Sequence, residues 1–288
     1  MLGAVAALHV RGVSPVWGEL VGRGRRVELP AYAFQRERFW LVDEGVSAGL
    51  AGVVTRLADS GGVVVSGRLS VGSRPWVADH VVAGRVLLPG TAFVELAVRA
   101  GDEVGCGLVE ELTLQAPLVV GVGEVELQVV VGAADGSGRR GLSVHSRVGE
   151  GEWTRHATGV LADRPASVEP IEAAWPPADA VAIDPEEVRA ALADRGYDYG
   201  PAWGGLRAVW RRGDEWFGEV VLPEGVSPEG FVVHPALLDT ALQPLVLEVS
   251  GPARLPFVWE RVSVVASGAT SVRVWLRPSA DGFSVVLA

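Results

Sequence analysis

The stretch that decides the fold is DHVVAGRVLLPGTAFVEL, residues 79–96. It places His80 four residues before Gly84 and nine residues before Pro89. After this proline, apolar residues recur at three- and four-residue spacing, which predicts a helix over residues 90–100 that is buried on one face. The start of a helix carries unpaired backbone N–H groups and the positive end of the helix dipole. We therefore expect a titratable imidazole beside a place that suits a carbonyl acquiring negative charge.

A second buried helix is predicted at HPALLDTALQPLVL, where Pro235 can occupy the first helical position. Asp239 is the only acid in this stretch, and most of its neighbours are apolar. Because burial penalises a charged carboxylate, we expect the pKa of Asp239 to be raised, so that the side chain can hold a proton at neutral pH. Gln243 lies one turn further on and can hold that carboxyl through its amide. His80 and Asp239 are thus a candidate base and acid.

The rest of the chain reads as two similar halves. Alternating apolar residues predict antiparallel strands over residues 53–162, interrupted by the first long helix. Residues 163–184 are rich in proline and alanine and predict a linker. A short helix then begins at Pro185 with Asp184 as its N-cap, and strands near 206–212, 216–222, 257–266, 271–277 and 283–287 flank the second buried helix.

The composition excludes several classes of function. The net charge of −10 argues against nucleic acid as a partner, and no apolar run is long enough to cross a membrane. All 25 basic residues are arginine, so a phosphate-binding loop with lysine and a Schiff-base lysine are excluded. Arginine without lysine suggests a GC-rich, bacterial coding sequence. Cys106 is the sole cysteine, which fits a reducing, cytoplasmic compartment, and no cluster has the spacing of a metal site.

Four motifs, in this order, resemble those of the dehydratase domains of modular type I polyketide synthases. They are a histidine, glycine and proline at His80, Gly84 and Pro89; GYDYGPAWGGL over residues 196–206, with Trp203 where the family usually has phenylalanine; Asp239 followed by Gln243; and LPFVW over residues 255–259. The resemblance implies an α+β double hot-dog fold, in which two tandem units each wrap an antiparallel sheet around one long helix.

The resemblance also divides the chain. It implies a remnant of the linker that follows an acyltransferase domain at residues 1–42, an N-terminal hot-dog unit at 43–162, an interdomain linker at 163–184 and a C-terminal hot-dog unit at 185–288. In the family the second unit continues with further strands. We therefore expect this unit to be truncated.

The activity that the resemblance implies is that of a hydro-lyase. A 3-hydroxyacyl thioester on a carrier protein would lose water and become α,β-unsaturated, as one step of polyketide or antibiotic biosynthesis in a multifunctional enzyme. His80 would be the general base and Asp239 the general acid. The backbone N–H groups of Gly90 and Thr91 would polarise the thioester oxygen.

The remaining site residues support this pair. Tyr199 and Gln243 would orient Asp239 by hydrogen bonds. The residues expected to line the substrate channel are Gly84, Pro89, Pro201, Trp203, Phe257 and Trp259.

No cofactor is expected, because elimination of water needs neither electrons nor a metal. The substrate would be carried on the phosphopantetheine of an acyl carrier protein. Neighbouring partners would be an acyltransferase upstream and a ketoreductase downstream, and a second copy could form a homodimer. Neither nucleic acid nor a membrane is expected as a partner.

Each assignment has a competing interpretation. His80 can be a surface or core histidine, Asp239 can be a buried acid paired with Arg254, and Tyr199 can be an aromatic flanking a turn. The aromatic residues of the channel can equally be core. For the whole chain, the alternatives are a non-catalytic module that binds a thioester or docks a neighbour, and an isomerase or oxa-Michael cyclase that uses the same pair.

Overall fold

The computed structural model describes residues 2–20, 49–163, 171 and 174–288. Two compact units are present, Met1–Val42 and Asp43–Ala288. In the first unit, the described part consists of the helices α1 (Leu2–Val10) and α2 (Trp17–Leu20). Across the ranges just given, no helix is both long and apolar enough to cross a membrane.

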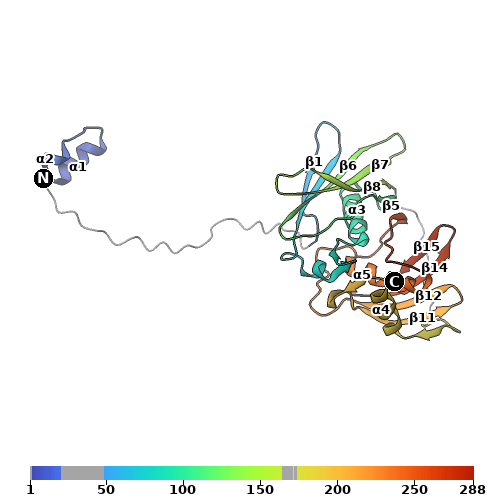
Figure 1. Cartoon of the computed structure of the whole chain (residues 1–288). Coiled ribbons are helices and arrows are strands. Elements are labelled where there is room, and N and C mark those ends of the chain that lie inside the picture. The colour runs from blue at the N-terminus through green and yellow to red at the C-terminus, as the bar shows by residue number, and fades with distance from the viewer. Residues whose placement is uncertain (1, 21–48, 164–170, 172–173) are drawn as a thin grey trace. The chain divides into compact units, whose positions relative to one another are not determined.

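The larger sheet of the second unit has seven antiparallel strands. In sheet order they are β1 (Val53–Arg56), β2 (Val63–Leu69), β6 (Val125–Ala134), β7 (Arg140–Val148), β8 (Thr154–Ala162), β5 (Leu108–Leu114) and β13 (Val258–Val262). Alternate residues of the long strands are buried, as the period of a strand with one covered face requires. Figure 1 shows the strands of this sheet curving around one helix.

That central helix is α3 (Gly90–Val104). Pro89 precedes it in an extended conformation, with φ −65° and ψ 152°, and Gly105 ends it with φ 73°. This left-handed conformation is one that glycine adopts without strain. The helix predicted over residues 90–100 is therefore confirmed, with about one further turn.

The smaller sheet covers the second buried helix, α5 (Pro235–Leu242). Its five antiparallel strands are, in sheet order, β15 (Gly282–Leu287), β14 (Ser271–Ser279), β12 (Glu215–Val221), β11 (Leu206–Arg212) and β9 (Val181–Ile183). The short helix α4 (Pro185–Asp194) begins as predicted, because Asp184 Oδ1 accepts a hydrogen bond from the Glu186 N–H at 2.9 Å.

The structure differs from the sequence predictions in the second half of the chain. The predicted helix over 235–248 ends at Leu242 and continues as the 3-10 helix η3 (Gln243–Glu248). Pro244 explains this change, because proline lacks an N–H and its ring clashes with the carbonyl four residues earlier. The predicted linker over 163–184 lies partly outside the described residues, and its last residues form β9, a strand too short for its alternation to be recognised.

The strand β13 also lies elsewhere than expected. Instead of joining the second sheet, it pairs with β5 of the first, with Val258 opposite Thr113 and Val262 opposite Val109. This pairing covers an edge of the larger sheet that would otherwise expose unpaired backbone groups. The chain thus returns from the second half to the first, which ties residues 43–288 into a single unit.

A small third sheet brings the first two motifs together. It consists of β10 (Tyr197–Tyr199), β3 (His80–Val82) and β4 (Arg85–Val86), with the 3-10 helices η1 (Pro75–Asp79) and η2 (Pro201–Trp203) beside it. Tyr199 pairs directly with His80. Two residues with positive φ, Ala83 at 50° and Gly84 at 72°, make the tight turn between β3 and β4.

Asp79 and Gly200 fix this junction. The Gly200 N–H donates to the Asp79 carbonyl at 2.8 Å, and Asp79 Oδ2 accepts from the Ala202 N–H at 2.9 Å. A Cβ at position 200 would lie 2.5 Å from Asp79 Cγ, which is closer than real Cβ contacts. The second motif therefore needs a glycine at this position.

Gly200→Ala is predicted to destabilise the protein by about 1–3 kcal/mol, because the added methyl group forces Asp79 and η2 apart. Urea unfolding followed by circular dichroism measures this loss. Gly72→Ala is the matched control, since a Cβ there would meet nothing nearer than 3.8 Å. Equal stability of the two variants would contradict the close contact.

Candidate active site

His80 is held in one orientation by its own hairpin. The side chain is 0% exposed, and its Nδ1 lies 2.9 Å from the carbonyl oxygen of Leu87. Because a carbonyl can only accept, Nδ1 carries the proton and Nε2 keeps its lone pair. Nε2 is buried and has no hydrogen-bond partner. The imidazole is therefore a neutral base with one nitrogen available.

The spacing of the first motif explains this arrangement. The turn at Gly84 reverses the chain, so that Leu87 returns to His80 and its N–H donates to the His80 carbonyl at 3.1 Å. Gly84 is thus a turn residue, and a Cβ on it would meet nothing within 4 Å. The sequence assigned it to the substrate channel; the left-handed backbone is the physical reason for its presence.

Asp239 projects from α5 and is 8% exposed. Burial raises the pKa of its carboxyl, while His80 and a hydrogen bond from the Tyr199 hydroxyl partly oppose that rise. Burial lowers the pKa of His80, which the charge of Asp239 partly opposes. Each group therefore favours its neutral form, the direction expected for Asp239 from the sequence, and the charge acting on Asp239 is that of His80 rather than of an arginine.

Tyr199 connects the two side chains. Its ring stacks on the imidazole of His80, with centroids 5.0 Å apart and planes inclined by 26°, and its hydroxyl hydrogen-bonds to Asp239. Burial and the neighbouring carboxyl raise the pKa of this phenol well above its usual value. The pairing of β10 with β3 therefore places in contact the residues that the first three motifs contribute.

Gln243 acts on a different group from the one expected. Its Nε2 donates to the carbonyl of Trp203 at 3.0 Å, so it holds η2 rather than the Asp239 carboxyl. The reason is that η2 packs against α5, where its carbonyl meets the amide at the start of η3. Trp203 is in turn fixed by its Nε1, which donates to the carbonyl of Trp76 at 3.1 Å, and its ring lies 4.7 Å from that of His80.

The beginning of α3 offers hydrogen-bond donors near this pair. Gly90 and Thr91 are its first residues, and N–H groups in the first turn of a helix lack intrahelical acceptors. The Thr91 hydroxyl donates to the carbonyl of Pro235 at 3.0 Å, which joins the starts of the two buried helices. Trp259 Nε1 is buried without a partner, and it would lie 4.0 Å from a Cβ at Gly90. An unused indole N–H therefore lies beside the helix start, a feature that the sequence did not reveal.

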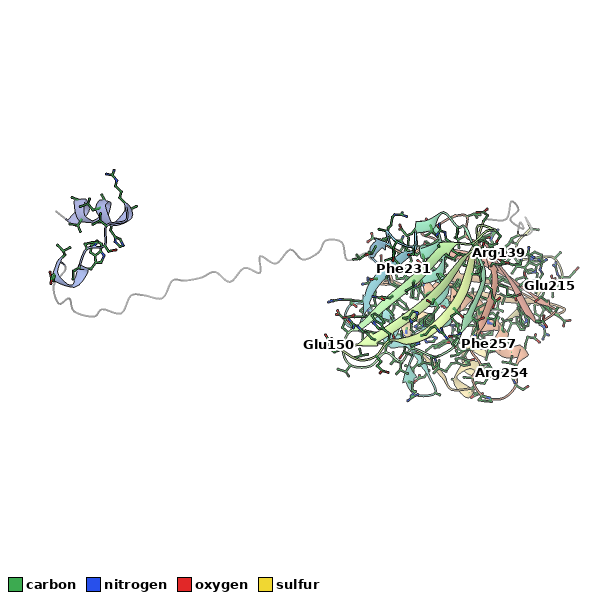
Figure 2. The ribbon with its side chains drawn as sticks, turned by 90° about the horizontal axis from the view of Figure 1, so that it is seen from above. Arg139, Glu150, Glu215, Phe231, Arg254 and Phe257 are labelled. Atoms are coloured by element: carbon green, nitrogen blue, oxygen red, sulfur yellow. The ribbon has the colours of Figure 1, made fainter. Side chains whose placement is uncertain are left out.

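The other residues assigned to the channel have different environments. Pro89 is buried and precedes α3, whereas Pro201 is exposed at the start of η2. Phe257 is 68% exposed, so it lies at the surface rather than in a buried wall (Figure 2). Trp203 is the member of this set that directly contacts the ring of His80.

Sequence reasoning missed one buried acid, Glu95, in the middle of α3. Its two carboxylate oxygens accept the N–H groups of Val232 and Val233 at 2.8 and 2.9 Å. A glutamate within the predicted apolar face, between Phe93 and Leu96, was the available signal. His234 begins α5 as a cap, since its Nδ1 accepts from the Ala236 N–H at 3.1 Å, and burial lowers its pKa to about 4.

On the larger sheet, both ring nitrogens of His156 have hydrogen-bond partners. His156 lies between Ser146, 2.7 Å from its Nε2, and the carbonyl of Ala116, 3.0 Å from its Nδ1. Over the described ranges, no group of three or more His, Cys, Asp or Glu side chains is placed to hold a metal ion.

Comparison with known families matches both halves of this unit. Residues 49–147 match the model described as "Polyketide synthase dehydratase domain", and residues 169–284 match "Polyketide synthase dehydratase N-terminal domain". Together the matches span most of the chain.

Curated relatives are much longer proteins. The chain is 50% identical to mycoketide-CoA synthase of Mycobacterium tuberculosis over 96% of its own length, but it spans only 7% of that protein. It is 47% identical to polyketide synthase GfsA of Streptomyces halstedii, over 95% of this chain and 4% of that one.

Solved structures share the fold. A structure from work on dehydratase substrate selection in the borrelidin and fluvirucin polyketide synthases is 49% identical, with a TM-score of 0.79 over 83% of this chain and 88% of the other. The crystal structure of the erythromycin dehydratase is 41% identical, with a TM-score of 0.78 over 85% and 91%. The α+β fold is thus that of the double hot-dog dehydratases, and the chain belongs to the family of dehydratase domains of modular type I polyketide synthases.

Proposed function

We propose that this domain removes water from a carrier-bound 3-hydroxyacyl thioester, with His80 as general base and Asp239 as general acid. The observation that carries the proposal is the pairing of a buried imidazole whose Nε2 has no partner with a buried carboxyl whose pKa is raised. One group can accept a proton and the other can donate one at the same pH.

Each proton that moves in this reaction has a donor and an acceptor within the site. His80 Nε2 takes the proton from the α-carbon, and Asp239 gives its proton to the hydroxyl on the β-carbon. The electron pair of the broken C–H bond forms the double bond as the C–O bond breaks and water leaves. The site is left with a protonated His80 and an ionised Asp239, and transfer of one proton from the former to the latter restores it.

The start of α3 supports the same reaction. As the α-proton leaves, negative charge moves onto the thioester oxygen, and N–H groups at Gly90 and Thr91 are suited to stabilise it. Tyr199 keeps the ring of His80 and the carboxyl of Asp239 in fixed relation.

The partners follow from the family. We infer that the substrate arrives on an acyl carrier protein and that acyltransferase and ketoreductase domains are neighbours, because the relatives are polyketide synthases many times longer than this chain. We also propose that the domain forms a homodimer and that residues 43–162 and 185–288 are its two hot-dog units.

His80→Gln and Asp239→Asn are each predicted to lower the rate of dehydration by on the order of 100- to 10,000-fold, because each removes one proton-transfer group. The measurement is mass spectrometry of a 3-hydroxyacyl pantetheine thioester for loss of one water. His145→Gln and Asp214→Asn are the matched controls, since both residues lie outside the site.

A wild-type protein that is folded but removes no water from any chain length or stereoisomer would favour a non-catalytic binding module. Chromatography of the products separates two further outcomes, a shifted double bond and a cyclic ether. The second matters because a 44%-identical structure is described as a bifunctional dehydratase-cyclase domain.

Tyr199→Phe is predicted to move the alkaline limb of the pH–rate profile to higher pH. The Tyr199 hydroxyl stabilises the ionised form of Asp239, so its removal raises the pKa of Asp239 further and keeps this general acid protonated to higher pH. The phenyl ring retains the stacking on His80. An unchanged or lowered alkaline limb would show that the hydroxyl does not act on Asp239.

A further inference from the structure

Glu95 is a buried acid that the proposed reaction does not use. It is 3% exposed, and its carboxylate receives two backbone N–H groups, from Val232 and Val233. Burial raises its pKa to about 7, and these two hydrogen bonds oppose the rise. The charged side chains that act on it, Arg99 and Asp102, are on its own helix, whereas the facing segment contributes the two N–H groups.

A second side chain of α3 holds the same segment. Thr91 precedes Glu95 by one helical turn, so both lie on one face of the helix. The Thr91 hydroxyl donates to the Pro235 carbonyl at 3.0 Å. We call Thr91 and Glu95 the α3 clamp; it binds residues 232, 233 and 235.

The clamped segment leads directly into α5. Asp239 follows Pro235 by about one helical turn, so the place where α5 starts determines where the carboxyl lies. The position of His80 relative to α3 is fixed as well, because α3 begins three residues after Leu87, whose carbonyl accepts a hydrogen bond from His80. The acid is thus positioned relative to the base through α3.

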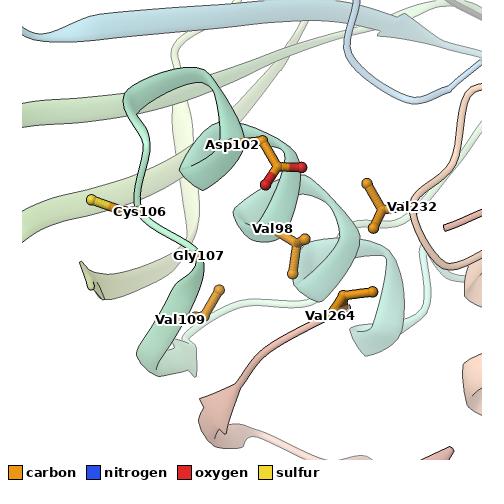
Figure 3. Close-up of a pocket in the computed structure, with 7 residues that line it drawn as sticks. All are labelled: Val98, Asp102, Cys106, Gly107, Val109, Val232 and Val264. Atoms are coloured by element: carbon orange, nitrogen blue, oxygen red, sulfur yellow. The ribbon is translucent and has the colours of Figure 1, made fainter. Parts of the chain in front are cut away.

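A small pocket borders this segment at Val232. Its volume of about 30 Å³ is enough to hold a water molecule. Figure 3 shows Val98 and Asp102 of α3 between Cys106 on one side and Val232 and Val264 on the other.

We propose that Glu95 is a positioning residue that fixes the start of α5, and thereby the place of Asp239 relative to His80, by binding the N–H groups of Val232 and Val233. Its effect on activity rests on the proposed dehydration. The role requires a carboxylate. An amide would turn its NH2 group toward one of the two backbone N–H groups and leave that N–H unpaired, and a protonated carboxyl would be a weaker acceptor than the ionised one.

The test compares Glu95→Gln and Glu95→Asp with Glu103→Gln, a matched change on the same helix. The first variant loses one acceptor, and the second keeps the charge but is too short to reach both N–H groups. Both are expected to lower kcat by on the order of 10- to 100-fold with little change in KM. In both variants the backbone amide hydrogens of residues 230–242 should also exchange with solvent faster than in the wild type. In Glu103→Gln, kcat and amide exchange should match the wild type.

The pH profile separates positioning from simple stabilisation. Ionised Glu95 predominates above its pKa of about 7 and is lost as the pH falls through that value. The kcat of the wild type should therefore fall in two steps on the acid side, one near pH 7 from Glu95 and one at lower pH from His80. Glu95→Gln should lack the upper step.

Wild-type kcat and amide exchange in either Glu95 variant would overturn the proposal. If Glu95→Gln does not fold, Glu95→Asp decides the matter by the same two measurements. If the wild type removes no water while the Glu95 variants still exchange faster over residues 230–242, the dehydration proposal fails and the positioning of α5 stands.

Discussion

The pairing of β10 with β3 is the interaction on which the site depends. It places Tyr199 opposite His80, and the ring of Tyr199 then reaches Asp239 on the second buried helix. The contact requires Gly200, because a side chain there would collide with Asp79. Two short strands, separated by more than a hundred residues of sequence, thus join the halves of the chain at the place where His80 and Asp239 lie near each other.

Burial makes the pair chemically useful and also demanding to hold. Low exposure lowers the pKa of His80 and raises that of Asp239, so both neutral forms coexist. The orientation of each side chain comes from hydrogen bonds between neutral groups. Nδ1 of His80 donates to the carbonyl of Leu87, and the Tyr199 hydroxyl donates to Asp239. In the proposed reaction, preorganisation by such bonds keeps one nitrogen and one proton available for the substrate.

Much of the fold and part of the site could be predicted from the sequence, because helices with one buried face and turns that contain glycine leave local patterns in the sequence. The positions of α3 and α5, the cap at Asp184 and the raised pKa of Asp239 were accessible in this way. The pairing of β13 with β5, the hydrogen bond from Gln243 to Trp203 and the hydrogen bonds that Glu95 accepts from residues 232 and 233 were not. Each depends on a contact between segments far apart in sequence, which periodicity does not encode.

The helix α3 lies beside both the hairpin of His80 and the segment that begins α5. Its first residue follows closely on the carbonyl that orients His80, and its first N–H groups are the donors that we propose for the oxyanion. One turn later, Glu95 holds the segment that starts α5. Because a helix is rigid over two turns, the groups at its start and the Glu95 carboxylate cannot shift independently of one another. A displacement of about 1 Å can lower a rate 100-fold, so placing the donors and the clamp on one helix protects the geometry more than separate loops would.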